Sequence, residues 1–271
     1  MNTATTHAPA AQQPVLFLSH GSPMTALGGD ELNATWAALA ARLRRPEAVV
    51  MVSAHWNTRL PILTGSAQPE TIHDFGGFPE ALYQIVYPAP GAPALARRIK
   101  DLLADKGIVA GIDATRGIDH GAWVPLRTLF PAADVPVLQL SVQPELDARH
   151  HVALGAALAP LAAENVLIVG SGHMTHNLHE YMRGKPRAAE TRAFRDWVHE
   201  RLLRGATDAL LDWHEKAPNA AFAHPSVEHF LPLFVALGAA GKDYATEWLG
   251  GGWVADVLAA DNYLFGKAAK S

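Results

Sequence analysis

Three short apolar runs, far apart in the chain, each lead into a histidine. The runs end at His20, His55 and His173, and each is built almost entirely of valine, leucine, isoleucine, phenylalanine or methionine before its last few residues. Runs of this length without polar alternation are typical of strands buried on both faces of a parallel sheet. Because open α/β sheets bind their ligands beyond the carboxyl ends of the strands, we predict that these histidines converge on one site.

Predicted helices and strands alternate along the rest of the chain. Apolar spacing and turn residues predict helices over 30–44, 93–106, 146–164, 188–203 and 208–215, and further strands over 60–64 and 135–142. A last helix is expected to begin at Pro225 and to end near Gly238, before one or two closing strands between residues 247 and 265. This alternation predicts an α/β fold, a three-layer α/β/α sandwich with a central mostly parallel or mixed sheet.

Length and composition narrow the class of protein. The 271 residues are 49% hydrophobic and 18% charged, which is enough apolar material for a sizeable core. The net charge of −4 gives no basic footprint for nucleic acid, and no apolar run approaches the roughly 18 residues of a membrane span. Cysteine is absent, which excludes thiolate metal sites and a cysteine nucleophile and is compatible with the cytoplasm. We expect one domain over residues 15–271, preceded by a disordered leader over residues 1–14.

The strand-end histidines point to metal binding. A single histidine in this position most often bonds a loop carbonyl. That explanation does not predict two strands that both end in histidine, as they do at His20 and His55. Imidazoles brought together in a crevice are most simply explained as ligands of a metal ion. His173 and His176 follow the third run, and either or both could face the crevice if Thr175 begins a helix.

A further ligand is expected from the last predicted helix. If Pro225 begins it, His224 lies in the loop before it and His229 lies near its start. Glu228 competes as a ligand, because two histidines and one carboxylate form the usual non-haem iron set. A first-turn carboxylate stabilised by the helix dipole is the simpler interpretation of Glu228, and we favour it.

Two glycine-rich loops carry further candidates. The loop over 71–79 contains His73, Phe75 and Phe78, and its irregular sequence suits a loop that covers a substrate. His120 lies between Asp119 and Gly121 in a second loop, where no apolar core demands an imidazole. The remaining histidines near helical patterns are predicted to be solvated: His150, His151, His179, His199 and His214.

Other catalytic signatures are missing from the sequence. There is no Gly-x-Gly-x-x-Gly after a strand, no phosphate-binding Walker loop and no His-Glu-x-x-His pair. Gly-x-Ser-x-Gly is also absent, so Ser171 is not expected to be a nucleophile.

Six motifs occur in an order that resembles a known family. They are Leu-Ser-His-Gly-Ser-Pro-Met, Val-Ser-Ala-His-Trp, Ile-His-Asp-Phe-Gly-Gly-Phe-Pro, Tyr-Pro-Ala-Pro-Gly, Asp-His-Gly-Ala-Trp and Glu-His-Phe-Leu-Pro-Leu. The chain is similar from Val15 onward to the DOPA 4,5-dioxygenase-like branch of the class III extradiol ring-cleavage dioxygenases. The resemblance implies a single-domain catalytic fold with one metal ion, iron(II) for oxygen chemistry, although relatives are also found with zinc.

The resemblance also implies roles for particular histidines. His20, His55 and His229 match the metal ligands, whereas the protocatechuate-cleaving relatives use two histidines and a glutamate. His176 matches a histidine assigned to acid/base work, for which a pKa near neutrality would be suitable. His120 matches a further active-site histidine.

The expected function is extradiol opening of a catechol ring, DOPA-like or otherwise substituted, with O2. Substrate contacts are expected from His73, Phe75, Phe78 and His224, and the protein is expected to be a monomer or homodimer. One alternative is a zinc-dependent hydrolase on the same histidines, because three imidazoles and an open position suit a zinc-activated water. A second alternative is a non-enzymatic binding protein that keeps the fold.

Overall fold

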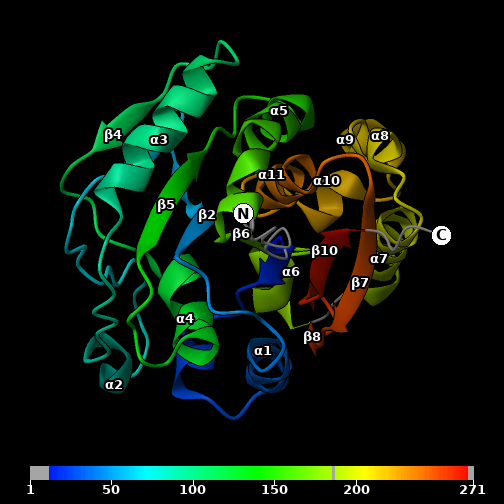
Figure 1. The fold of residues 1–271 in the computed structure, drawn as a ribbon. Helices are drawn as coiled ribbons and strands as arrows, with labels where there is room; N and C mark the ends of the chain where they lie inside the picture. The colour runs from blue at the N-terminus through cyan, green and yellow to red at the C-terminus, as the bar shows by residue number, and fades with distance from the viewer. Residues whose placement is uncertain (1–11, 185–186, 268–271) are drawn as a thin grey trace, which may run out of the picture.

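The computed structural model describes residues 12–184 and 187–267, which form a mixed eight-stranded sheet with helices on both faces. The strand order is β4-β3-β5-β2-β6-β1-β10-β7 (Figure 1). The strands are β1 (Val15–Ser19), β2 (Ala48–Asn57), β3 (Ile62–Thr64), β4 (Gly111–Asp113), β5 (Val137–Val142), β6 (Val166–Gly172), β7 (Tyr244–Gly250) and β10 (Asn262–Lys267). A separate small sheet pairs β8 (Trp253–Val254) with β9 (Leu258–Ala259). Most of the leader predicted for residues 1–14 lies outside the described residues, and the division at residue 15 stays a prediction.

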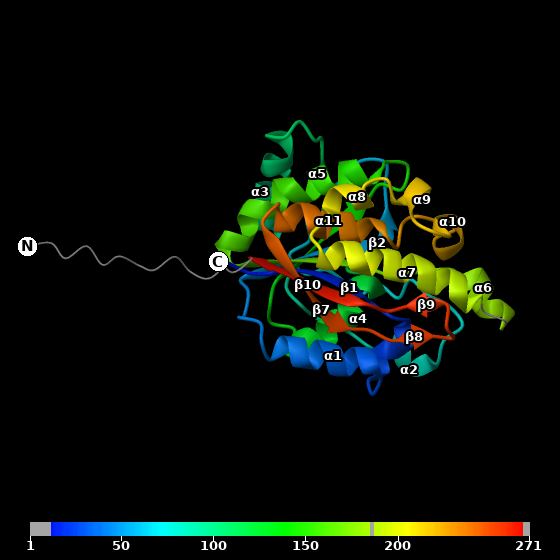
Figure 2. The same ribbon diagram turned by 90° about the vertical axis from the view of Figure 1, so that its right-hand side faces the viewer.

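Two helical layers enclose the sheet, as Figure 2 shows. On one face lie α3 (Pro93–Ala104), α5 (Ala148–Leu158), α7 (Ala188–Leu203) and α11 (Leu231–Ala240); on the other lie α1 (Glu31–Ala40) and α4 (His120–Leu129). Shorter helices connect these elements: η1 (Pro23–Leu27), α2 (Glu80–Tyr83), η2 (Ala159–Glu164), α6 (Leu178–Arg183), α8 (Thr207–Leu210), α9 (Trp213–Lys216) and α10 (Ala220–Ala223). The predicted three-layer α/β/α sandwich is confirmed, and its sheet is mixed. Within the described ranges, no helix is long and apolar enough to cross a membrane.

The central strands are buried on both sides, as their unbroken apolar runs predict. In β1, Leu16 and Leu18 pack into the core beneath α1 and α4, whereas Val15 and Phe17 face the core beneath α5 and α11. Because each strand contributes to two cores, polar residues are excluded until the strand ends.

The strand order brings the three apolar runs of the sequence side by side. β6 lies between β2 and β1, and it is parallel to both. The carboxyl ends of these strands therefore lie side by side at the same end of the sheet. His20 follows β1 there, and His173 follows β6. His55 lies within β2, because this strand continues to Asn57.

Two predicted helix starts are wrong. The last helix begins at Leu231 rather than Pro225, and residues 225–230 form turns that carry His229 in front of the helix. Thr175 does not begin a helix either, because α6 starts at Leu178 after Asn177, whose side chain accepts a hydrogen bond from the Glu180 amide. The helix predicted over 208–215 is two short helices, α8 and α9.

Close helix packing sets the position of α11. A Cβ atom on Gly238 of α11 would overlap the Val152 carbonyl oxygen of α5, and one on Gly155 of α5 would overlap the Val235 carbonyl of α11. The two backbones can approach so closely because both positions lack a side chain. Backbone carbonyls cannot rotate aside as a flexible side chain can, so added volume at this contact must separate the helices.

We expect Gly238→Ala to lower the free energy of unfolding by about 1–3 kcal/mol, the usual cost of overpacking, even though alanine is the better helix former. Urea unfolding followed by circular dichroism measures this difference. Gly76→Ala is the matched control, because nothing lies within 4 Å of a Cβ at Gly76. Equal stability of both variants and the parent protein would contradict the packing explanation.

Candidate metal centre

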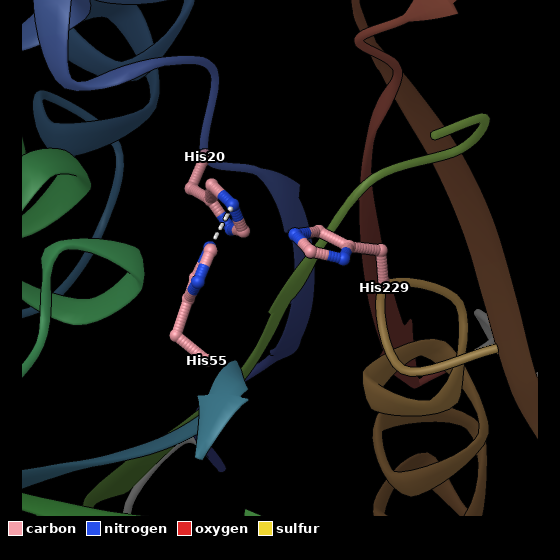
Figure 3. A group of neighbouring side chains, drawn as sticks. All are labelled: His20, His55 and His229. Atoms are coloured by element: carbon pink, nitrogen blue, oxygen red, sulfur yellow. Dashed lines mark hydrogen bonds between the residues drawn. The ribbon is translucent and has the colours of Figure 1, made fainter. Parts of the chain in front are cut away.

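Three imidazoles converge where the strands end. His20 comes from the end of β1, His55 from β2 and His229 from the turn before α11, and their rings point toward one another (Figure 3). One nitrogen from each ring lies within 4.8 Å of the other two. The Nε2 atoms of His20 and His55 are 3.0 Å apart.

Neighbouring oxygen atoms determine which ring nitrogen carries the proton. The Nδ1–H of His20 donates to Ser171 Oγ at 3.0 Å, since the hydroxyl proton of Ser171 is itself donated to the Gly121 carbonyl. The Nδ1–H of His229 donates to Glu228 Oε1 at 3.0 Å. Each of these contacts leaves Nε2 unprotonated with its lone pair toward the other rings.

The resulting donor set fits a divalent cation. His229 Nε2 is buried and has no hydrogen-bond partner among the described residues. Burial, reinforced by the neighbouring imidazoles, holds the pKa values of His20 and His229 well below the usual range and lowers the pKa of His55 to about 3. Two imidazole nitrogens bound to one ion at about 2.0–2.1 Å are themselves about 3–3.4 Å apart, which agrees with the His20–His55 separation. Iron(II) and zinc(II) both accept neutral imidazole ligands.

A carboxylate joins His55 to a fourth histidine at the edge of the cluster. Asp74 Oδ1 accepts hydrogen bonds from both the backbone amide and Nδ1 of His120, at 3.0 and 2.9 Å. Its other oxygen lies 3.6 Å from His55 Nδ1. Burial opposes ionisation of this carboxyl group, but the His120 hydrogen bonds outweigh it and lower the pKa of Asp74 to about 2.

His176 stacks on the candidate ligand His229. The two ring centroids are 3.4 Å apart and the planes differ by 12°. Burial and the nearby His173 lower the pKa of His176 to about 2, below the near-neutral value that suits acid/base work. The ring is therefore neutral at physiological pH, and a ring nitrogen can accept a hydrogen bond.

His173 connects two segments of the site through hydrogen bonds. Its amide donates to the His229 carbonyl at 2.8 Å, and its Nε2 lies 3.2 Å from the Gly21 carbonyl. It therefore links the loop after His20 to the turn that carries His229. Gly21 has a φ of +74°, and a Cβ there would also press against Thr25, so glycine is required beside this contact.

The histidines open into a cavity of about 800 Å³. Six of them contribute to its wall: His20, His55, His120, His173, His176 and His229. Phe75 and Phe78 from the predicted covering loop and Trp253 from β8 also line it. An apolar cavity with a few convergent polar groups is the usual form of a small-molecule site.

Two residues predicted to contact substrate lie away from the cavity wall. His73 donates from Nε2 to the Ile85 carbonyl at 2.9 Å, just after α2. His224 is 1% exposed, bonds the Met174 carbonyl and packs against Phe230. Neither is among the described residues that line the cavity, and each imidazole bonds a nearby backbone carbonyl.

Further corrections concern residues interpreted from local sequence. Glu228 precedes α11 by three residues, so it is not a first-turn carboxylate, and its oxygen is bonded to His229 and Ser226. His151, predicted to be solvated, is fully buried between the Asp147 carbonyl and the Gln143 amide. These contacts depend on how loops fold back, which helical periodicity does not encode.

A buried carboxylate that the sequence analysis did not single out supports the site. Asp119 accepts hydrogen bonds from Ser53 Oγ at 2.7 Å and Gln139 Nε2 at 2.8 Å, and Arg116 lies 3.2 Å away. Burial raises the pKa of Asp119. The network ties the start of α4, and hence His120, to β2 and β5. Its one sequence signal is that Asp119 directly precedes His120.

Comparisons with known proteins agree on one family. Residues 14–266 match the LigB family, described as the catalytic LigB subunit of aromatic ring-opening dioxygenase. A 4,5-DOPA dioxygenase extradiol from Beta vulgaris is 42% identical over 259 residues, covering 92% of this chain and 95% of that protein. A protein of the same name from Escherichia coli strain K12 is 40% identical over 238 residues, covering 85% and 86%. The crystal structure of an uncharacterized protein from Escherichia coli K12 superposes with a TM-score of 0.80 at 32% identity, covering 94% of this chain and 100% of that one.

We expect the histidine cluster to bind one divalent metal ion per chain. His20→Ala, His55→Ala and His229→Ala should each weaken binding by at least about 100-fold, more than the 10–100-fold typical of a lost supporting hydrogen bond. Metal content after dialysis, measured by elemental analysis, checks this. His179→Ala is the control, since His179 is exposed on α6. Retention of stoichiometric metal by all three variants would refute the ligand set.

Proposed function

The chain belongs to the LigB family of aromatic ring-opening dioxygenases, and we propose that it opens a substituted catechol next to its two hydroxyl-bearing carbons. It is an extradiol dioxygenase, as the resemblance in its sequence motifs predicts and as relatives named 4,5-DOPA dioxygenase extradiol support. The observation that carries the proposal is the convergence of three imidazoles at an apolar cavity in a chain of this family.

We assign His20, His55 and His229 as the metal ligands, with iron(II) as the active ion. When bound, the metal supplies Lewis acidity toward a catechol hydroxyl and, as iron(II), electron density toward O2. The three neutral ligands leave the full charge of the ion available to a doubly coordinating catechol. Ser171 and Glu228 support this assignment, because they orient His20 and His229 through Nδ1.

Proton handling falls to His176 and His120. We assign the acid/base role to His176, which is neutral and lines the cavity beside His229, where it can accept a hydrogen bond from a catechol hydroxyl. His120 lines the same cavity, and its Nδ1–H is engaged with Asp74. Its Nε2 is thus an acceptor for a hydrogen bond from substrate. Phe75 and Phe78 provide apolar surface for the aromatic ring.

The alternative of a zinc-dependent hydrolase uses the same three imidazoles. Family membership favours the dioxygenase, so we retain zinc as an ion that can occupy the site in purified protein rather than as the active one. The cytoplasmic location and the choice between monomer and homodimer stay predictions from the sequence.

We expect protein loaded anaerobically with iron(II) to consume O2 and form a yellow ring-opened product from at least one catechol. Oxygen uptake and visible absorbance measure this, with chelator-treated protein as the inactive control. His176→Ala should lower kcat by about 10²–10⁴-fold while metal content is retained. If no catechol in a broad panel is opened by iron-loaded protein, the dioxygenase proposal fails, whatever the metal content.

The cavity mouth favours substrates whose side chains are not anionic. Among the described residues, those that line the cavity include Asp30 and Glu31 but no lysine or arginine. Asp30 caps α1 through the Asn33 amide, which leaves Glu31 as the freer carboxylate. Charge of one sign at the mouth of an apolar cleft attracts ligands of the opposite sign and repels like charge. We therefore expect catecholamines to be better substrates than catechol carboxylates.

Glu31→Gln should reduce the ratio of kcat/KM for dopamine over protocatechuate by about 3–10-fold, the effect of roughly 1 kcal/mol between exposed charges. The difference should shrink as salt is added. Glu47→Gln is the matched control, since Glu47 is exposed just before β2, at the opposite end of that strand from His55. An unchanged ratio in Glu31→Gln would contradict electrostatic selection at the mouth.

A further inference from the structure

We propose that Asp74 is a positioning residue that holds the proton of His120 on Nδ1 and stabilises the Nδ1–H form of His55 that a metal ion requires. It belongs to the loop that lines the cavity, so one carboxylate contacts the metal ligand and the histidine that faces the substrate. The inference rests on the proposed role of His55 as a ligand, and it is tested by zinc(II) affinity, which does not depend on dioxygenase activity.

The contacts of Asp74 divide between its two oxygens. Oδ1 receives both the amide and the Nδ1–H of His120, at 3.0 and 2.9 Å. Oδ2 faces His55 Nδ1 at 3.6 Å. This distance is too long for a good hydrogen bond, but it is short enough for an attraction between the carboxylate charge and the N–H dipole. The two imidazoles are themselves neighbours, with ring centroids 3.9 Å apart.

This arrangement favours the tautomer of His55 that a metal ion requires. An unprotonated Nδ1 would direct a lone pair at a carboxylate oxygen, which is repulsive, whereas Nδ1–H directs a positive dipole at it. His55 Nε2 forms a 3.0 Å hydrogen bond with His20 Nε2, and because His20 donates its own proton to Ser171, His55 supplies the proton of this bond while no ion is bound. A metal ion at Nε2 requires the proton to be on Nδ1 instead. Asp74 stabilises that form, as supporting carboxylates do in other metal sites.

The base of the loop is anchored well enough to hold the carboxylate in place. The Ile72 amide donates to the Ile118 carbonyl at 2.8 Å, and the Ile72 carbonyl accepts from Trp123 Nε1 of α4 at 2.9 Å. Asp74 follows two residues later and bonds to the first residue of α4. The loop is therefore tied to the same helix before and at Asp74, and Phe75 continues from there into the cavity wall.

A packing role and a tautomer-fixing role predict opposite orders for two variants. In Asp74→Asn the side-chain oxygen keeps the two His120 contacts, so the amide group faces His55 Nδ1 as a donor. This contact stabilises the form of His55 that carries its proton on Nε2 and has no free lone pair there for a metal ion. Asp74→Ala removes the partner without imposing the wrong tautomer. A packing role would instead make the nearly isosteric asparagine the milder change.

The test is zinc(II) titration of chelator-stripped protein against a chromophoric competitor. We expect Asp74→Asn to weaken zinc binding about 10–100-fold, at least as much as Asp74→Ala. Glu70→Gln is the matched control, because it makes the same change at an exposed carboxylate directly before the loop, and it should keep the zinc affinity of the parent protein.

Several results would overturn the inference. It fails if Asp74→Asn binds zinc as the parent does, or if alanine is clearly the worse substitution. His55, Asp74 and His120 also lie close enough to share a cation. Two zinc ions per parent chain that fall to one in Asp74→Asn would make Asp74 a ligand and likewise overturn a positioning role. A parent protein that binds no zinc would refute the proposed metal centre, and the inference on Asp74 with it.

Discussion

Unprotonated ring nitrogens that face one another in a buried place repel, and this electrostatic constraint shapes the site. His20 and His229 are each held in this state by an oxygen at Nδ1, from Ser171 and Glu228 respectively. His20 Nε2 forms a 3.0 Å hydrogen bond with His55 Nε2, whereas the buried lone pair of His229 Nε2 has no partner among the described residues. A cation at this position would bind to that lone pair. Burial contributes in the same direction, because it disfavours protonation, which would be the other way to remove the repulsion.

Backbone proximity makes this convergence possible. A Cβ on Gly172 would overlap the His229 carbonyl, and one on Gly170 would overlap the Pro232 carbonyl. The last residues of β6 therefore let the start of α11 lie directly on the sheet. The turn before α11 can then bring His229 to the strand ends that carry His20 and His55. In this sense the ligand geometry depends on two positions without side chains as much as on the histidines.

The sequence predicted the structure best where an apolar run is followed by a histidine. Apolar runs identified the central strands, and their histidines identified the edge of the sheet where the cavity lies. Periodicity failed for His229, because Pro225 suggested a helix start six residues before the real one at Leu231. It also failed for His224, which bonds the Met174 carbonyl, and for His151 of α5, which bonds the Asp147 carbonyl at the start of that helix and the Gln143 amide. Helical and strand patterns describe faces of regular elements, whereas the partners of these two imidazoles lie outside the regular elements.

The chain separation of the converging imidazoles has a consequence for biogenesis. His20 and His229 are about 200 residues apart, and β1 pairs on one side with β10, near the end of the described chain. Contacts of such long range form late, because much of the chain must be ordered before they are gained. During synthesis, the nascent protein cannot complete its cation site until its last helix has left the ribosome. Metal binding is therefore coupled to the end of folding. A chain that is truncated before His229 lacks the third imidazole.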